Sequence, residues 1–208
     1  YASGDKVDLL LPEVQRELIE AVMKVGKPTI VLNMTGSAMD LRFEQEHADA
    51  IMQIWYPGAR GGKVIADLLF GKMSPSGKLP ITFYNDTADL PAFEDYSMKG
   101  RTYRYLESAP LYPFGYGLSY TTFEYANLEM NAEAHTSDKE ITLSFDVTNT
   151  GSVKADEVAQ IYLSPADGNP NIRPIQLQGF ARVTLEPGET HKVVVKMHVE
   201  QFGYYSNE

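Results

Sequence analysis

The spacing of apolar residues changes along the chain, and this change limits the folds that the sequence can adopt. Near the N-terminus Val14, Leu18, Val22 and Val25 recur at helical spacing. Over residues 141–148 apolar and polar side chains alternate strictly, as in a strand with one buried and one solvated face. The sequence therefore predicts an α/β first half followed by an all-β second half.

The first half predicts helices that alternate with strands. A helix is expected between Pro12 and Gly26, and another over residues 64–69. The apolar runs 29–34 and 50–55 are typical of strands covered on both faces. This order favours an α/β sandwich with a mostly parallel sheet. Ligands of such sheets gather at the carboxyl ends of the strands, here the loops 35–38 and 56–62.

The second half predicts a β-sandwich of the immunoglobulin or fibronectin III type. Besides residues 141–148, strand-like runs cover 157–163, 176–185 and 191–199. About five strands are expected after Thr122, whereas such sandwiches usually have about seven. We therefore expect a truncated module with an open sheet edge, which could pair chains into a homo-oligomer.

A segment rich in aromatic residues separates the two halves. Ten of the 23 aromatic residues lie between Phe93 and Tyr125, among prolines and glycines that exclude a regular helix. This composition indicates an ordered connector rather than a flexible linker. We expect an α/β part over residues 1–89, a connector over 90–125 packed on it, and a β-sandwich over 126–208.

Composition excludes several classes of partner. The formal net charge of −10 disfavours nucleic acid, and no apolar run approaches the ~20 residues that span a bilayer. Cysteine is absent and the four histidines lack metal-ligand spacing, so we expect no disulfide, metal or cofactor. Cytoplasmic, periplasmic and secreted locations all remain compatible. The start at Tyr1, without initiator Met or signal-peptide character, suggests a piece of a longer protein.

The glycine-rich run over residues 58–63 invites comparison with a phosphate-binding loop, because it follows a strand and opens a helix. Val64 stands where that motif needs Ser or Thr, and the glycine spacing is one residue short. The run is better explained by close approach of strand, turn and helix. A flavodoxin-like nucleotide-binding enzyme is therefore disfavoured.

Several long motifs, in order, resemble the C-terminal half of glycoside hydrolase family 3. They are LLLPEVQREL, GKPTIVLNMTG, AIMQIWYPGARGGKVIADLLFGKMSPSGKLPITF, GRTYRY and LYPFGYGLSYTTFEY. The later stretches VTNTGSVKADEVAQIYLS and QLQGFARVTLEPGET look like the fibronectin-III-like module that often follows it. The resemblance covers nearly the whole chain.

The resemblance implies a retaining, exo-acting β-glycosidase, a β-xylosidase or β-glucosidase, acting on β-linked oligosaccharides or aryl glycosides. In this family an Asp nucleophile comes from a (β/α)8 barrel and the Glu acid/base commonly from the α/β sandwich. This chain has no barrel, and the resemblance places the acidic segment at about Ala2 and the residues before Tyr1, because Asp5-Lys6 stands where relatives have an Asp-Arg pair. We therefore expect no catalytic residue here and no activity of the chain alone.

The resemblance and the strand-end loops suggest three substrate-binding candidates, Asp5, Lys6 and Asp95. For Asp5 and Lys6 the competing explanation is a solvated terminus or ion pair. Trp55 is expected to pack in a core rather than to carry a sugar. Arg101 and Arg104 either reach the absent barrel or hold the connector to this chain. The alternative function is a non-catalytic carbohydrate-binding or adhesion module.

Overall fold

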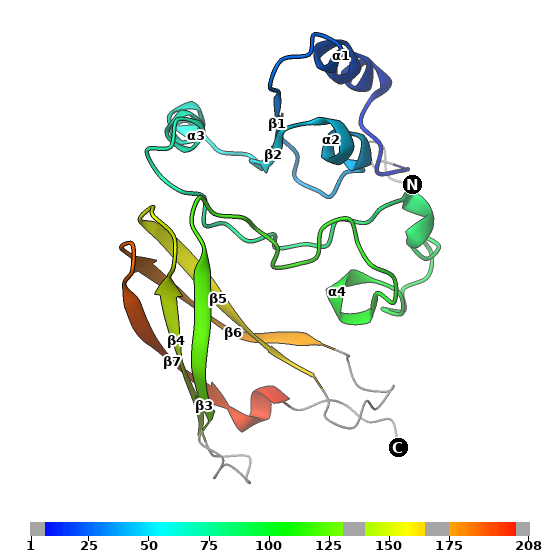
Figure 1. Cartoon of the computed structure of the whole chain (residues 1–208). Helices are drawn as coiled ribbons and strands as arrows, with labels where there is room; N and C mark the ends of the chain where they lie inside the picture. The colour runs from blue at the N-terminus through cyan, green and yellow to red at the C-terminus, as the bar shows by residue number, and fades with distance from the viewer. Residues whose placement is uncertain (1–6, 131–139, 165–174, 203–208) are drawn as a thin grey trace. The chain divides into compact units, whose positions relative to one another are not determined.

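The computed structural model describes residues 7–130, 140–164 and 175–202. It divides into two compact units, which we describe separately (Figure 1). Unit 1 comprises Tyr1–Ala66 and Leu79–Tyr116, and unit 2 comprises Asp67–Lys78 and Gly117–Glu208. The chain therefore passes between the units three times. The domain limits expected from sequence stay a prediction.

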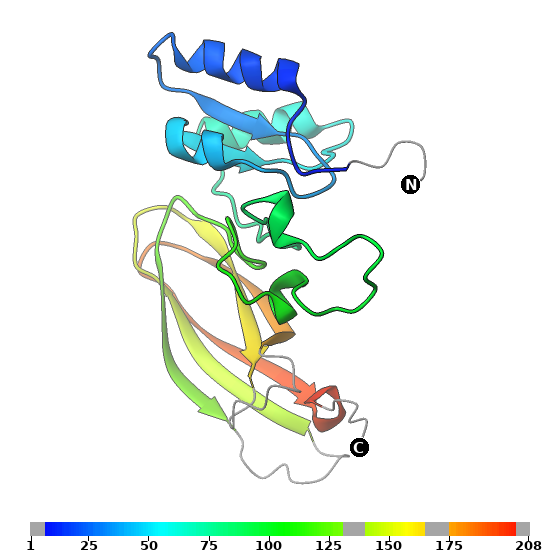
Figure 2. The same cartoon turned by 90° about the vertical axis from the view of Figure 1, so that its right-hand side faces the viewer.

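Unit 1 contains a small parallel sheet with helices around it, which confirms the α/β prediction. Strand β1 (Ile30–Asn33) pairs in parallel with β2 (Ala50–Gln53). Helices α1 (Glu13–Met23) and α2 (Arg42–His47) lie to one side of these strands, and the start of α3 (Gly61–Leu69) lies to the other (Figures 1 and 2). Two short helices, η1 (Thr87–Asp89) and α4 (Thr102–Tyr105), follow.

Helix α1 forms where the periodicity predicts it, but the predicted apolar stripe points to solvent and not into the core of unit 1. Val14 and Leu18 are 70% and 64% exposed, whereas Ile19 and Met23, about a quarter-turn or more further round, are half-buried. Strand β1 differs in the same way, because Ile30 and Leu32 are exposed. The expectation of a strand covered on both faces is therefore wrong for β1 among the described residues, because these two side chains stay partly open to solvent.

The core of unit 1 gathers residues from the loops after β1 and from the aromatic segment. Met39, Leu41 and Phe83 are buried, and Trp55 and Tyr112 pack against them. Phe83 forms an isolated antiparallel bridge with Tyr112 through backbone hydrogen bonds of 2.9 and 3.2 Å. The rings of Tyr103 and Phe114 stack with centroids 4.2 Å apart. The part of the aromatic segment in unit 1 is thus ordered by ring packing, as its composition predicts.

The glycine run after β2 serves close packing, which agrees with the structural interpretation of that motif. A Cβ on Gly61, at the start of α3, would lie 2.6 Å from two ring carbons of Pro57. Such a contact is too short for any side chain larger than hydrogen. Gly61 therefore lets the turn after β2 fold directly onto the first residue of the helix.

Unit 2 is a β-sandwich of two antiparallel sheets. One sheet has the order β3-β4-β7, formed by Phe123–Met130, Glu140–Asn149 and Thr190–His198. The other pairs β5 (Ala155–Leu163) with β6 (Gln176–Leu185). The short helix η2 (Val199–Phe202) follows. The five described strands match the number expected from sequence.

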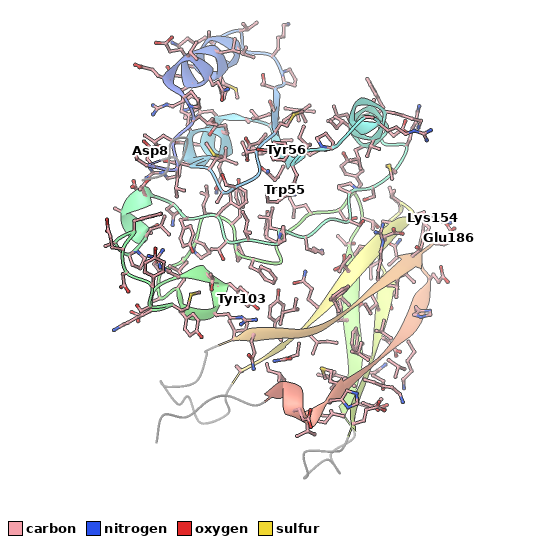
Figure 3. All side chains as sticks on the ribbon, turned by 180° about the vertical axis from the view of Figure 1, so that it is seen from behind. Asp8, Trp55, Tyr56, Tyr103, Lys154 and Glu186 are labelled. Atoms are coloured by element: carbon pink, nitrogen blue, oxygen red, sulfur yellow. The ribbon has the colours of Figure 1, made fainter. Side chains whose placement is uncertain are left out.

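Strict alternation along β4 and β5 builds the core between these sheets. Phe145 and Val147 on β4 are buried together with Ala159 on β5, Leu185 on β6 and Val193 on β7. On the surface, Lys154 just before β5 forms an ion pair with Glu186 just after β6, and this pair joins the ends of the two strands (Figure 3).

A buried carboxylate binds distant segments of unit 2 together. Glu157 on β5 is only 7% exposed, and its oxygens lie 3.2 Å from Nζ of Lys78. The Tyr125 hydroxyl donates to Glu157 at 2.8 Å, and Lys78 also donates to the carbonyl of Gly117 at 3.3 Å. Burial, followed by this hydrogen bond, raises the pKa of Tyr125, so its proton stays in place.

In the described part of the chain, no helix is long and apolar enough to cross a membrane.

The inter-sheet core predicts a large cost for truncating Leu185, which is 1% exposed. Leu185→Ala should lower the free energy of unfolding of unit 2 by about 2–5 kcal/mol, because it leaves a cavity. The matched control is Phe180→Ala on the same strand, where the ring is 68% exposed and the change should be within about 0.5 kcal/mol. Urea unfolding followed by circular dichroism measures both, and equal losses would contradict this core.

Candidate functional site

Two amide side chains meet at the carboxyl end of the parallel sheet. Asn33 and Gln53 are register partners, so their side chains point to the same face. Nδ2 of Asn33 donates to Oε1 of Gln53 at 2.6 Å, and Nε2 of Gln53 donates to the carbonyl of Thr35 at 3.0 Å. Since Asn33 is buried, this chain of bonds fixes the loop after β1 to the end of β2.

The aromatic ring exposed at this end of the sheet is Tyr56, not Trp55 (Figure 3). Trp55 packs edge-on against Phe83, with centroids 6.5 Å apart, which confirms that it is a core residue. Tyr56 is 76% exposed and covers Gly36, where a Cβ would lie 2.7 Å from the ring. Sequence reasoning missed Tyr56, although its place in the loop that follows β2 was a signal that could have found it.

A charged cluster follows the loop after β1. Nε and Nη2 of Arg42 bind the two carboxylate oxygens of Asp40 at 2.9 and 2.6 Å, and Nη2 also lies 3.0 Å from Asp86. Burial opposes ionisation of Asp40, but the hydrogen bonds and charge of Arg42 outweigh it and lower the pKa. The backbone N–H of Ala88, and then Arg42, lower the pKa of Asp86. Both carboxylates therefore stay ionised at neutral pH.

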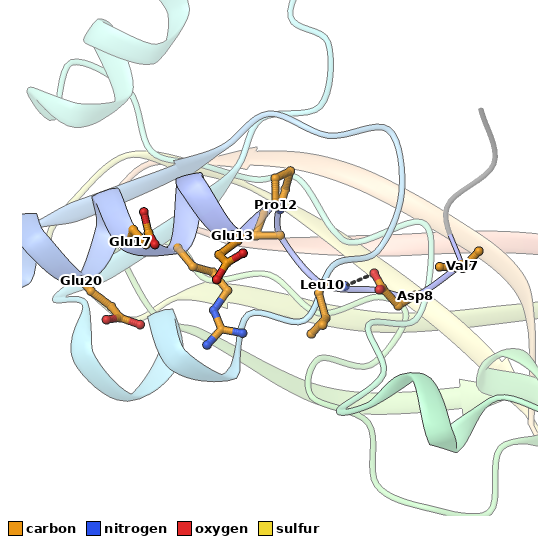
Figure 4. A pocket seen from close by; sticks show the side chains of 9 residues that line it. Val7, Asp8, Leu10, Pro12, Glu13, Glu17 and Glu20 are labelled. Atoms are coloured by element: carbon orange, nitrogen blue, oxygen red, sulfur yellow. Dashed lines mark hydrogen bonds between the residues drawn. The ribbon is translucent and has the colours of Figure 1, made fainter. Parts of the chain in front are cut away.

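The segment before α1 is tied to this cluster. The carbonyl of Leu9 accepts from the N–H of Asp40 at 2.8 Å, and the N–H of Leu9 donates to Oγ1 of Thr87 at 3.0 Å. Asp8 caps the N–H of Leu10 at 3.0 Å (Figure 4). Asp5 and Lys6 precede this anchored stretch and lie outside the described residues, so their expected role stays a prediction.

An open groove runs between this segment and the first turns of α1 (Figure 4). Its volume is about 670 Å³. Its polar lining is mainly acidic, from Asp8, Glu13, Glu17 and Glu20, with Arg16 as the cation. Its apolar lining comes from Val7, Leu10, Leu11 and Pro12.

Asp95, the third predicted substrate-binding residue, lies in an exposed loop that is held by its own bonds. Its Oδ1 accepts from the N–H of Ser97 at 2.8 Å, which is the largest cause of its lowered pKa. Nη2 of Arg101 donates to the carbonyls of Ala92 and Asp95 at 2.8 and 2.9 Å. The contacts described here join Asp95 to its own loop and not to the Arg42 cluster. Its binding role stays a prediction.

The two connector arginines bind within this chain. Arg101 holds the loop just described, and Nε of Arg104 donates to the Tyr103 hydroxyl at 3.3 Å. The Arg104 guanidinium also lies 5.7 Å from the centre of the Tyr103 ring. These contacts lie within residues 90–125 themselves, so the two alternatives for these arginines stay predictions.

Glu44 is a buried carboxyl that sequence reasoning missed. It lies on α2 and is 2% exposed. Burial raises its pKa, and the charge of Asp40 adds to this, whereas its own backbone N–H and Arg16 oppose it. The polar stretch over residues 42–49 gave no sign that one carboxyl would be enclosed by the helix and the core.

Comparison with known proteins identifies the family. Residues 2–120 match the model of the glycosyl hydrolase family 3 C-terminal domain, and residues 157–208 match a fibronectin type III-like domain. The chain belongs to glycoside hydrolase family 3. This confirms the resemblance read from the sequence motifs and the predicted order of an α/β region before antiparallel sheets.

The family 3 relatives are much longer than this chain. It is 44% identical to a xylan 1,4-beta-xylosidase of Xylanibacter ruminicola over all of this chain and 24% of that protein. It is 37% identical to a periplasmic beta-glucosidase of Salmonella typhimurium, covering 29% of that protein. The chain thus spans about a quarter to a third of the curated relatives it matches.

Solved structures agree with the fold of this family 3 chain. Beta-glucosidase 3B of Thermotoga neapolitana in complex with glucose superposes with a TM-score of 0.85 at 31% identity, over 97% of this chain and 30% of that one. A beta-D-glucoside glucohydrolase of Trichoderma reesei gives a TM-score of 0.89 at 27% identity, over 99% and 33%.

Within the described ranges, no group of three or more His, Asp or Glu side chains could hold a metal ion.

The raised pKa of Glu44 predicts a pH-dependent cost. Its folded pKa exceeds the ordinary 4.5, so the folded state binds the proton more tightly, and stability falls as pH rises from about 4.5 through the folded pKa. Glu44→Gln should therefore raise the melting temperature at pH 7, and this gain should vanish below pH 4.5. Glu46→Gln, on the exposed side of α2, is the control and should change little at either pH. A gain from Glu44→Gln that is independent of pH would contradict the assignment.

Proposed function

We propose that this chain is the non-barrel part of a retaining, exo-acting β-glycosidase that removes terminal β-linked sugars. The observation that carries the proposal is the match to the Xylanibacter ruminicola xylan 1,4-beta-xylosidase, which extends over the whole chain but only 24% of that protein. The rest of such an enzyme would supply the barrel and its nucleophile.

The carboxyl groups of the charged cluster support a binding rather than a catalytic role. Retaining hydrolysis needs a nucleophile and a proton donor about 5 Å apart, and the donor needs a raised pKa. Asp40 and Asp86 have lowered pKa values and both bind Arg42. Glu44 has the raised pKa that a donor needs, but it is buried away from any sugar. The acid/base would therefore come from another part of the polypeptide.

The chain's own contribution would be a wall of the sugar pocket at the strand ends. The Asn33–Gln53 bonds fix the loop after β1, and Asp40 and Thr87 hold the segment that follows Asp5 and Lys6 through the backbone of Leu9. A rigid support of this kind keeps substrate-binding groups in position. We infer that Asp5 and Lys6 lie at the rim of the pocket.

A β-xyloside is the favoured substrate over a β-glucoside. The GRTYRY motif before the PFGYGLSYT run resembles xylosidase-type members more than typical glucosidases. Relatives named as xylosidases support this preference, including a beta-xylosidase of Formosa agariphila at 37% identity.

The proposal predicts that the 208-residue chain alone does not hydrolyse aryl β-xyloside or aryl β-glucoside, because it lacks the nucleophile. Release of nitrophenol from the purified chain measures this, with a full-length family 3 xylosidase as positive control. Turnover above buffer that is lost on substitution of a carboxylate in this chain would contradict the proposal.

The exposed ring of Tyr56 favours a second candidate, a carbohydrate-binding or adhesion module, since exposed rings can stack on sugars. Fluorescence titration of the chain with xylo- and cello-oligosaccharides separates the two functions. Saturable binding that is lost in Tyr56→Ala would support the module, whereas no saturation is expected if the sugar is gripped mainly by the barrel.

A further inference from the structure

The segment over residues 91–101, which we call the 91–101 loop, is closed on itself by one arginine. It stands out as a green loop between the short helices η1 and α4 (Figure 2). Nη2 of Arg101 donates to the carbonyls of Ala92 and Asp95 at 2.8 and 2.9 Å. The N–H of Arg101 donates to the carbonyl of Met98 at 3.0 Å. The two ends of the loop are thus held together, as in the compact surface loops that often carry function.

Further bonds fix the course of the chain inside the 91–101 loop. The N–H of Asp95 donates to the carbonyl of Ala92 at 3.0 Å, and the N–H of Ser97 donates to Oδ1 of Asp95 at 2.8 Å. Tyr96 lies between these two bonded residues. Its side chain is nevertheless 90% exposed, the highest fraction among the large apolar side chains of the described residues. The loop therefore holds the backbone of Tyr96 while its ring faces solvent.

The 91–101 loop is followed by a residue with a strained backbone. Thr102 has a φ of 57°, in the left-handed region that a β-branched side chain rarely adopts. Its N–H donates to the Tyr84 hydroxyl at 2.8 Å, which anchors the end of the loop. Burial of the loop does not account for the strain, because residues 92–99 are all exposed. Such strain is typical of functional segments, where it fixes the geometry that binding requires.

The side chains beside Tyr96 favour a sugar as its partner. Four of its neighbours in the loop are polar or charged, namely Glu94, Asp95, Ser97 and Lys99. These residue types are depleted from the cores of protein interfaces, and the two carboxylates disfavour an anionic partner. A ring with hydrogen-bonding groups beside it is common in small-molecule sites. The backbone hydrogen bond from Ser97 lowers the pKa of Asp95, so its carboxylate can accept hydrogen bonds from sugar hydroxyls at neutral pH.

We propose that the 91–101 loop binds the leaving-group end of a β-linked xylan oligosaccharide, with the ring of Tyr96 as the stacking surface and Arg101 as the positioning residue. An exo-acting enzyme takes only the terminal sugar into its pocket, so a contact outside the pocket is with the sugars of the leaving group. The inference rests on the proposed function, because that function supplies the pocket for the terminal sugar. Phe93, which is 62% exposed, offers a second ring in the same loop.

Saturation-transfer NMR of the 208-residue chain with xylotetraose tests the contact without catalysis. A single ring contact is weak, so we expect transfer to the sugar without saturation of the chain. Tyr96→Ala removes the stacking surface and should lower the transfer at least about threefold, whereas Tyr96→Phe keeps the ring and should retain most of it. The matched control is Tyr56→Ala, also in unit 1, where the ring is 76% exposed and the transfer should not change.

Two results of this experiment would overturn the proposal. The first is the absence of transfer from the unchanged chain to xylotetraose. The second is a loss of transfer in Tyr96→Ala that is no larger than the loss in Tyr56→Ala.

A double-mutant cycle tests the positioning role of Arg101. Lysine lacks the planar fork that donates to both carbonyls, so Arg101→Lys should lower the transfer at least about twofold. In the Tyr96→Ala background the same substitution should change nothing further, because the ring that Arg101 positions is gone. No effect of Arg101→Lys, or an equal effect in both backgrounds, would contradict this role.

Kinetics separate the loop from the proposed function. The enzyme is a chimera in which this chain replaces the matched quarter of the Xylanibacter ruminicola xylosidase. Tyr96→Ala should raise the KM for xylotetraose at least about threefold, and should leave kcat/KM for methyl β-xyloside, which has no leaving-group sugar, within about twofold. Equal changes for both substrates would overturn the proposal. A chimera that binds xylotetraose through Tyr96 but does not hydrolyse it would contradict the proposed function alone.

Discussion

The buried carboxylate of Glu157 is the interaction on which the assembly of unit 2 depends. It joins Lys78 and Tyr125, which lie 79 and 32 residues away in sequence, at distances of 3.2 and 2.8 Å. Removing one partner of a buried ion pair lowers the free energy of unfolding by roughly 3–5 kcal/mol, because the remaining charge is left buried without compensation. The sandwich therefore requires the segment Asp67–Lys78, which comes before the aromatic segment, to pack with β5.

This constraint explains why the chain is interleaved rather than divided at one linker. The chain gives unit 2 the segment Asp67–Lys78, returns to unit 1 for Leu79–Tyr116, and then enters the sandwich. Lys78 is the last residue before the chain returns to unit 1, and its ammonium also binds the carbonyl of Gly117, where the chain re-enters unit 2. One side chain thus joins the two residues that flank the segment Leu79–Tyr116.

The sequence predicted well those elements whose burial follows from local spacing. The alternation over residues 141–148 predicted β4 and its inward face, because every second residue must point into the sandwich. Helix α2 was missed, because its residues are polar and its burial of Glu44 depends on distant packing. The outward stripe of α1 was also unpredictable, since spacing shows that a face is apolar but not what covers it.

The candidate site was also predicted from the sequence only in part. The loops 35–38 and 56–62 were expected to bind ligands; Asn33 and Gln53 end the strands just before these loops, Tyr56 opens the second one, and the binding role stays a prediction. The ion pairs of Arg42 with Asp40 and Asp86 were not predicted, because Asp86 lies 44 residues from Arg42. The family was recognised from several long motifs in the right order. The structure shows the contacts by which residues of these motifs fix the loop after β1, the start of α3 and the segment before α1.

The most direct test of the account replaces the matched quarter of the Xylanibacter ruminicola xylosidase with this chain. We expect a folded chimera that hydrolyses aryl β-xyloside with retention of anomeric configuration, which proton NMR of the first-formed product measures. A chimera that folds and binds xylose but shows no turnover would contradict the claim that this chain is a working part of such an enzyme.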